Sequence, residues 1–125
     1  MMKLVYLGLA GAAGTLARFW VMEGMKRAFD SVMPWGTWTA NILGCFLFGL
    51  IWVLAEERGI VSADFRFFAL VGFMGSFTTF STYAFESVDL FRAGAVLSCI
   101  INLAGQNVAG LCAVLAGMAL ARSFG

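Results

Sequence analysis

Long runs of hydrophobic residues, separated by short polar stretches, dominate this chain. The four longest runs span residues 4–22, 38–55, 67–91 and 95–121. A helix needs about 20 apolar residues to cross roughly 30 Å of hydrocarbon, and each run is long enough to do so. The pattern therefore predicts an all-α integral membrane protein with four transmembrane helices, which form a single domain over residues 1–125.

The composition supports a membrane location and argues against enzymatic chemistry. Hydrophobic residues make up 62% of the chain and charged residues only 12%, which is too apolar for an ordinary water-facing surface. There is no histidine, so a Ser-His-Asp triad or a typical zinc site cannot be assembled. The three cysteines lie inside the hydrophobic runs without metal-ligand spacing. We expect neither an enzyme nor a nucleic-acid partner for a chain of net charge +1.

Basic residues are divided almost equally between the two sides of a four-span bundle. One side would carry Lys3, Arg58, Arg66 and Arg122. The other would carry Lys26, Arg27 and Arg92, together with Arg18 if the first span ends before it. Orientation normally follows an excess of Lys and Arg on the cytoplasmic side, and this chain lacks such an excess. We therefore predict dual topology and an antiparallel homodimer. The alternative is a weak bias that depends on the exact span boundaries.

The third run contains an unusually polar stretch, GSFTTFSTY, at residues 75–83. Gly72 and Gly75 weaken a helix here, and the hydroxyls of Thr78 and Thr79 can bond to nearby backbone. These residues predict a third helix that is broken in the middle of the membrane. Free carbonyls at the end of the first half would suit a cation, and free N–H groups at the start of the second would suit an anion. The alternative is one continuous helix with hydroxyls bonded back to it.

After the predicted break, polar groups line one face of the chain. At about 100° per residue, Thr79, Tyr83 and Glu86 share a face, with Thr82 on one flank and Phe80 on the other. Hydroxyl donors beside the positive edge of an aromatic ring suit a small, hard anion. Glu86 fits such a path only if its carboxyl group is protonated or paired with a base.

Other polar residues lie within the remaining runs. Asn41 follows Thr37 by one helical turn on the same face, which favours a pore-facing amide. Arg18 lies near a span end, where it either snorkels to the headgroups or serves a site. For three amides of the fourth run, helix packing and function remain equally open: Asn102, Gln106 and Asn107.

Residues 75–83, with Gly72 before them and Glu86 after them, resemble the signature of the Fluc/CrcB family of fluoride channels. GAAGTLAR at residues 11–18 and WGTWTAN at residues 35–41 agree with it. The resemblance implies an antiparallel dual-topology homodimer with two pores in the inner (plasma) membrane of a microbe. Such a channel passes fluoride passively, rejects chloride and exports fluoride from the cytoplasm.

The resemblance also implies roles for individual residues. Asn41, Phe80 and Tyr83 would line the fluoride path. The hydroxyls of Ser81 and Thr82 would lie nearby. The chain has tyrosine at position 83, where the family more often has phenylalanine, so the anion site there is expected to be wetter or to bind the ion differently.

A structural cation is implied as well. Backbone carbonyls of Gly75 and Thr78 from both subunits would bind one sodium ion at the dimer interface. Arg18 would lie near a pore vestibule.

Two other functions are compatible with a small apolar bundle. A dual-topology multidrug exporter would need a carboxylate in the first span, and residues 4–22 contain none. A non-conducting membrane assembly subunit would use the polar face only to join helices.

Overall fold

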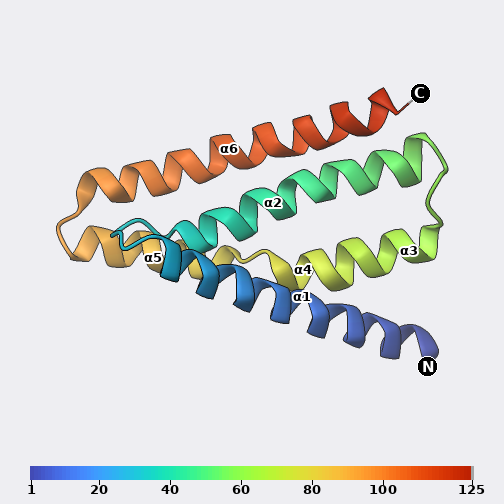
Figure 1. Cartoon of the computed structure of the whole chain (residues 1–125), viewed down its shortest axis with the longest axis horizontal. Helices are drawn as coiled ribbons and strands as arrows, with labels where there is room; N and C mark the ends of the chain where they lie inside the picture. The colour runs from blue at the N-terminus through green and yellow to red at the C-terminus, as the bar shows by residue number, and fades with distance from the viewer. Residues whose placement is uncertain (125) are drawn as a thin grey trace.

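The computed structural model describes residues 1–124 as an assembly of helices, with no strand in that range (Figure 1). The α-helices are α1 (Met2–Ala28), α2 (Trp35–Trp52), α3 (Ala63–Phe67), α4 (Gly75–Phe77), α5 (Phe80–Arg92) and α6 (Val96–Ser123). Two π-helical segments continue them, η1 (Val53–Glu57) after α2 and η2 (Phe68–Met74) between α3 and α4. Both termini lie at the same end of the bundle (Figure 1).

These elements form four rods that are long and apolar enough to cross a membrane. They span Met2–Ala28, Trp35–Glu57, Ala63–Arg92 and Val96–Ser123. The prediction of four spans is confirmed, and the largest differences are at the end of the first span, which was predicted at Met22 and lies at Ala28, and at the start of the third, which was predicted at Phe67 and lies at Ala63. The first helix continues past Met22 because Lys26 and Arg27 can extend into the headgroup region while their backbone remains helical. Hydropathy alone therefore underestimates helix length.

The third rod changes conformation at Thr78 and Thr79. Thr78 has φ −83° and ψ 155°, and Thr79 has φ −146° and ψ 113°, so both residues are extended. The Thr79 hydroxyl accepts a hydrogen bond from the Thr82 N–H at 3.2 Å and so caps the start of α5. Two extended residues thus separate α4, which ends at Phe77, from α5, which starts at Phe80.

Glycines allow α2 and α6 to pack closely along their length. A Cβ atom at Gly49 would collide with the carbonyl of Val114, and one at Gly117 would collide with the carbonyl of Phe46. On the other side of the bundle, Gly14 of α1 lies against the backbone of η2 in the same way. Close backbone approach through small residues is typical of membrane helix pairs. These contacts set how α2, α6 and α1 are rotated around the site described below.

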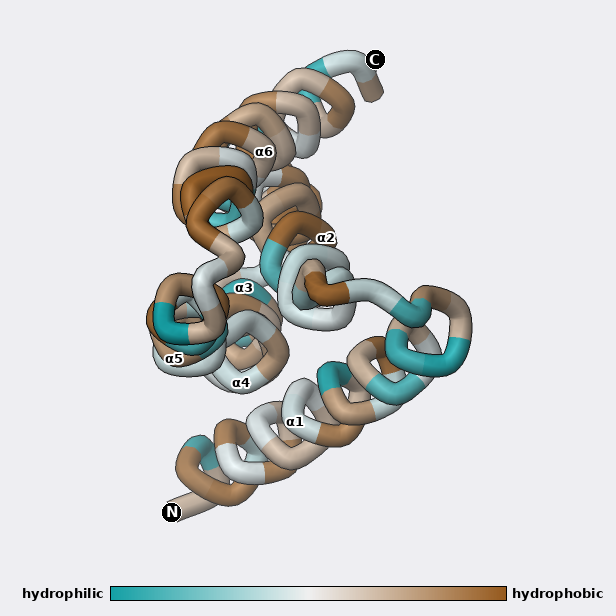
Figure 2. Tube along the Cα trace, turned by 90° about the vertical axis from the view of Figure 1, so that its left-hand side faces the viewer, coloured by the Kyte–Doolittle hydropathy of each residue, from teal (hydrophilic) through white to brown (hydrophobic). Residues whose placement is uncertain are grey.

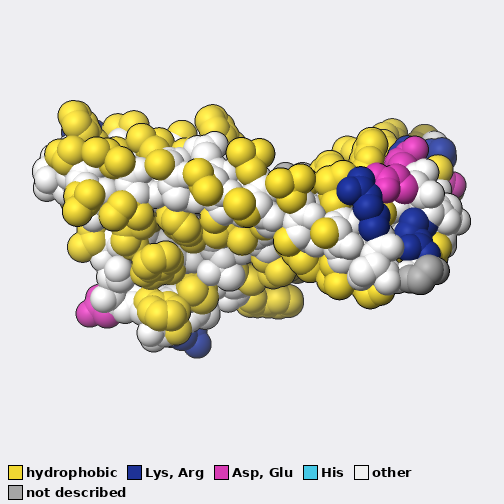
Figure 3. Space-filling model, turned by 90° about the horizontal axis from the view of Figure 1, so that it is seen from above, with side chains coloured by type: hydrophobic (Ala, Val, Ile, Leu, Met, Phe, Trp, Pro, Cys, Tyr) yellow, Lys and Arg dark blue, Asp and Glu magenta, His cyan; other side chains and the backbone are white. Residues whose placement is uncertain are grey.

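The outer surface of the bundle is apolar along its length and charged at its ends. Hydrophobic positions run along most of α1 and α6 (Figure 2), and Figure 3 shows hydrophobic side chains over most of one face. At the end that holds the termini, ion pairs join Lys3 to Asp64, Arg66 to Glu56 and Arg122 to Glu57. Such a surface requires lipid around it, which identifies a multi-pass membrane protein.

Candidate functional site

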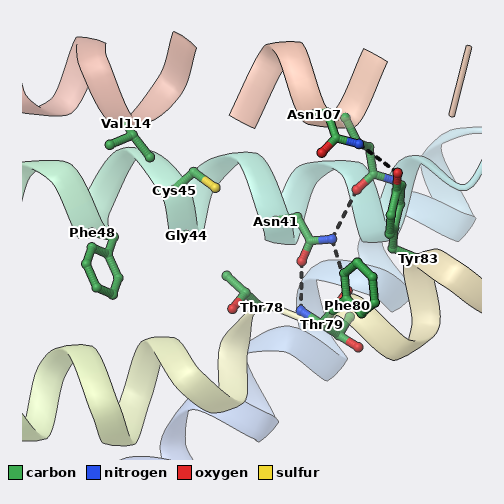
Figure 4. A pocket seen from close by; sticks show the side chains of 11 residues that line it. Asn41, Gly44, Cys45, Phe48, Thr78, Thr79, Phe80, Tyr83, Asn107 and Val114 are labelled. Atoms are coloured by element: carbon green, nitrogen blue, oxygen red, sulfur yellow. Dashed lines mark hydrogen bonds between the residues drawn. The ribbon is translucent and has the colours of Figure 1, made fainter. Parts of the chain in front are cut away.

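A cavity of about 330 Å³ lies between α2, α6 and the junction of α4 with α5 (Figure 4). We call it the Asn41 cavity. Its lining includes seven residues that the sequence singled out: Asn41, Thr78, Thr79, Phe80, Tyr83, Gln106 and Asn107. The other lining residues are Gly44, Cys45, Phe48 and Val114. Three separate segments of the chain, in α2, at residues 78–83 and in α6, therefore bring polar side chains to one cavity within an apolar bundle.

Asn41 pairs with the extended backbone of Thr79. Its Nδ2 donates to the Thr79 carbonyl at 3.1 Å, and the Thr79 N–H donates to its Oδ1 at 2.7 Å. Gly44, one turn further along α2, has no side chain, which leaves room for the Thr78 methyl group. The two hydrogen bonds satisfy backbone groups that have left the helix, and a nonpolar environment would otherwise make such groups costly. They also orient the Asn41 amide within the cavity.

Hydroxyl groups cluster where α5 begins. The Thr79 hydroxyl donates to Oγ1 of Thr82 at 2.9 Å and lies 3.5 Å from Oγ of Ser81. Ser81 and Thr82 do not line the Asn41 cavity in the single chain, but they bond to a residue that does. The cluster therefore places three hydroxyls next to the cavity wall.

Two aromatic rings flank this cluster. The centroids of Phe80 and Tyr83 are 5.7 Å apart and their planes are tilted by 50°. Phe80 is 79% exposed in the single chain, whereas Tyr83 is 9% exposed. The Tyr83 hydroxyl donates to the Leu103 carbonyl at 3.1 Å and accepts from Nδ2 of Asn107 at 2.8 Å. Tyr83 is thus fixed to α6, while Phe80 faces outward.

A chain of side-chain amides extends from Asn41 into α6. Nδ2 of Asn41 also donates to Oε1 of Gln106 at 3.0 Å, and Nε2 of Gln106 donates to Oδ1 of Asn102 at 2.8 Å. The same Asn102 oxygen accepts from the indole N–H of Trp38 at 2.7 Å. Asn102 Nδ2 donates to the Ser87 hydroxyl at 2.9 Å. The sequence had left the α6 amides without a role, although the one-turn spacing of Asn102 and Gln106 could have indicated a shared face.

Glu86 lies in a second space, of about 260 Å³, which we call the Glu86 cavity. It is lined among others by Lys26, Thr37, Glu86 and Asp89. The Thr37 hydroxyl donates to Oε1 of Glu86 at 2.8 Å, and Oε2 is buried without a hydrogen-bond partner among the described residues. The predicted polar face is therefore divided, with Thr79 and Tyr83 in one cavity and Glu86 in the next.

The remaining predicted residues lie outside both cavities. Arg18 is half-buried on α1, and Gly75 is exposed at the start of α4. In a continuous helix the Thr79 N–H would bond the Gly75 carbonyl, but here it bonds Asn41. Likewise the Thr82 N–H, which would bond the Thr78 carbonyl, bonds the Thr79 hydroxyl instead. The carbonyls of Gly75 and Thr78 are therefore released from these helical partners.

No group of three or more His, Cys, Asp or Glu side chains lies close enough to hold a metal ion within residues 1–124. Backbone carbonyl oxygens in general suit an alkali cation better than zinc or another transition metal, which prefers nitrogen or sulfur.

Comparison with known proteins gives a consistent result. Residues 5–118 match the family described as "CrcB-like protein, Camphor Resistance (CrcB)". A protein of Nitrosococcus oceani named "Fluoride-specific ion channel FluC" is 48% identical over 120 residues, which cover 96% of each chain. Proteins of the same name from Solidesulfovibrio magneticus and Maridesulfovibrio salexigens are 48% and 42% identical over at least 96% of each chain.

Proposed function

Because the chain belongs to the CrcB family, whose matched relatives are named as fluoride-specific ion channels, we propose that it is a passive fluoride channel. Its family is one of channels and not of enzymes. The observation that carries the proposal is the Asn41 cavity, where an oriented amide, hydroxyl groups and aromatic ring edges meet inside an apolar bundle. Intramembrane polar groups of this kind mark ion pathways.

The fluoride path would follow donors along one wall. The Asn41 amide and the edges of Phe80 and Tyr83 carry positive potential without a full positive charge. The hydroxyls of Ser81 and Thr82 extend the wall along α5. Fluoride is small and accepts strong hydrogen bonds, so closely spaced neutral donors replace its hydration shell better than that of chloride. Rejection of chloride follows from this difference.

We propose that the channel is an antiparallel homodimer with two pores. Phe80 lies on the wall of the Asn41 cavity yet is 79% exposed, so the cavity is open on the side of this ring. A second copy in the opposite orientation would close it, and two-fold symmetry would produce two equivalent pores. The nearly equal division of basic residues between the two ends supports insertion in both orientations.

One sodium ion would lie where the two copies meet. The carbonyls of Gly75 and Thr78, which are released from their helical partners, would supply oxygen ligands from each subunit. A bound sodium ion would offset the partial negative charge of these carbonyls. Alignment of the third rod across the bilayer would then place this junction near the middle of the membrane.

The expected location is the inner (plasma) membrane of a microbe, where the channel would release cytoplasmic fluoride.

The two competing functions have less support. The carboxylate of α1 is Glu23, which lies near the end of the helix and pairs with Lys26 at 3.6 Å, so it is poorly placed to bind drugs and protons as an exporter requires. An assembly subunit would not need hydroxyls and rings beside a cavity.

Fluoride efflux from proteoliposomes tests the proposal. Purified protein would be reconstituted with internal fluoride, a potassium ionophore would clamp the voltage, and an electrode would record external fluoride. Parallel vesicles would contain chloride. Rapid fluoride release with little chloride release is expected. Absence of fluoride release from a folded, reconstituted dimer would contradict the channel function.

A further inference from the structure

The amide nitrogen of Asn41 has two hydrogen atoms, and both are used within the chain. One is donated to the Thr79 carbonyl at 3.1 Å and the other to Oε1 of Gln106 at 3.0 Å. An amide nitrogen has no further proton to offer. Any anion that binds to this nitrogen must therefore displace one of these two acceptors.

The Thr79 carbonyl is the harder acceptor to displace. It belongs to a two-bond pairing in which the Thr79 N–H also donates to Oδ1 of Asn41 at 2.7 Å. Moving the amide away from it would break both bonds and leave backbone groups unpaired. Gln106 contributes a single bond. The Asn41 hydrogen that is donated to Gln106 is thus the one available to an anion.

The rest of the amide chain determines that Gln106 presents an oxygen and not a nitrogen to Asn41. Oδ1 of Asn102 accepts from the Trp38 indole at 2.7 Å and from Nε2 of Gln106 at 2.8 Å. Asn102 is completely buried, and its own Nδ2 is held by the Ser87 hydroxyl at 2.9 Å. A rotated Gln106 amide would bring two carbonyl oxygens together in a buried place, which is unfavourable.

From this arrangement we propose that Gln106 sets the anion affinity of the site, because its carbonyl oxygen accepts the hydrogen bond that Asn41 would give to an anion until fluoride displaces it. The proposal rests on the fluoride channel function proposed above. Without an anion, the Gln106 oxygen spares the amide the cost of an unpaired donor. An entering anion gains only the difference in free energy between its own hydrogen bond to Asn41 and the bond that Asn41 makes to Gln106.

Displacing Gln106 costs every anion the same hydrogen bond, so Gln106 lowers the affinity for all anions and does not change the ratio between two of them. Fluoride can offset this cost, because hydrogen bonds to an ionised acceptor are about twice as strong as those between neutral groups. Gln106, which is 7% exposed and lines the Asn41 cavity, therefore sets how tightly the anion is held.

The test replaces Gln106 with methionine, which has a similar length but no carbonyl. Fluoride efflux from proteoliposomes would be measured over a series of fluoride concentrations, with chloride efflux in parallel. We expect the half-saturating fluoride concentration to fall about fivefold, the factor that one net hydrogen bond is worth. The ratio of fluoride to chloride flux should stay unchanged, because the bond to Gln106 costs both anions the same free energy. In an Asn41→Ser background the same replacement should leave the half-saturating concentration unchanged.

Gln106→Ser provides a second variant if the methionine chain does not fold. Its hydroxyl can donate to Asn102, one turn away, but is too short to reach Asn41, so the same fall in half-saturating concentration is expected. An unchanged or higher half-saturating concentration in the variants, with fluoride flux intact in the unaltered protein, would overturn the role of Gln106 alone. Absence of fluoride flux in the unaltered protein would overturn both this role and the channel function.

Discussion

The side-chain amide of Asn41 bonds both the N–H and the carbonyl of Thr79, a residue 38 positions further along the chain. This pairing joins α2 to the two extended residues between α4 and α5. It replaces the helical hydrogen bonds that Thr79 has lost, and it fixes the amide at the wall of the Asn41 cavity. One side chain therefore has a structural role and a proposed functional role.

Replacement of Asn41 with alanine should affect both roles. We expect fluoride flux to fall by roughly tenfold or more, because a hydrogen bond to an ion is worth about 1.5–3 kcal/mol. The unpaired backbone of Thr79 should lower stability by about 1–3 kcal/mol. Flux in proteoliposomes and thermal unfolding in detergent would be measured together. Thr39→Ala is the matched control, since this hydroxyl bonds the Trp35 carbonyl of its own helix. Unchanged flux in Asn41→Ala would argue against a pore role.

Loss of the Tyr83 hydroxyl should be mild. Tyr83→Phe removes the bonds to Asn107 and to the Leu103 carbonyl but retains the ring beside Phe80. We expect a stability loss of about 1 kcal/mol and fluoride flux within a few-fold of the unaltered protein. Tyr83→Ala, which removes the ring, should lower flux much more. Equal flux in the two variants would show that the ring edge is not needed.

Asn107 allows the same bond to be examined from its other end. In a double-mutant cycle, Asn107→Leu and Tyr83→Phe should be non-additive in unfolding free energy, because each one breaks the same 2.8 Å hydrogen bond. Full additivity would indicate that the bond does not form in the membrane.

Glycine substitutions should separate close packing from simple helix propensity. Gly117→Ala places a methyl group against the carbonyl of Phe46 and should push α2 and α6 apart, at a cost of about 1–3 kcal/mol. Gly8→Ala is the control, since nothing lies within 4 Å of the added atom. It should be neutral or slightly stabilising. Thermal unfolding of both variants would be compared, and similar midpoints would contradict the packing at Gly117.

Thr37 and Glu86 form the polar pair of the Glu86 cavity. Thr37→Val removes the donor to Oε1 of Glu86 and should lower stability by about 1.5–3 kcal/mol, because a partly buried carboxyl group loses a partner. Replacing both residues, Thr37 with valine and Glu86 with leucine, should cost less than Thr37→Val alone. A double variant that is less stable than the single one would show that Glu86 has further partners.

Removal of sodium tests the proposed cation. If the carbonyls of Gly75 and Thr78 hold sodium, protein purified with N-methylglucamine as the sole cation should unfold at a lower temperature and conduct less fluoride. Addition of sodium should restore both properties, and potassium at the same ionic strength is the control. Identical behaviour in all three cations would remove sodium from the proposal.

The sequence by itself determined the number of membrane spans. Hydrophobicity is a local property that sums over about 20 neighbouring residues, so it can be read without knowledge of the fold. The break of the third helix around Gly75 stays a prediction: Gly75 is helical in the structure, and the extended residues are Thr78 and Thr79. Span ends were less accurate, because a helix continues through polar residues that reach the headgroups.

Only the tertiary structure decided which polar groups meet. Asn41 finds Thr79 and Gln106 across 38 and 65 residues, and Glu86 turns away from Tyr83 to bond Thr37 in another cavity. These partners depend on the rotation and separation of α2, α5 and α6. Close contacts at glycines such as Gly49 and Gly117 set that rotation. A helical face in the sequence shows which side chains point in one direction, but the packing of the neighbouring helix determines what they bond.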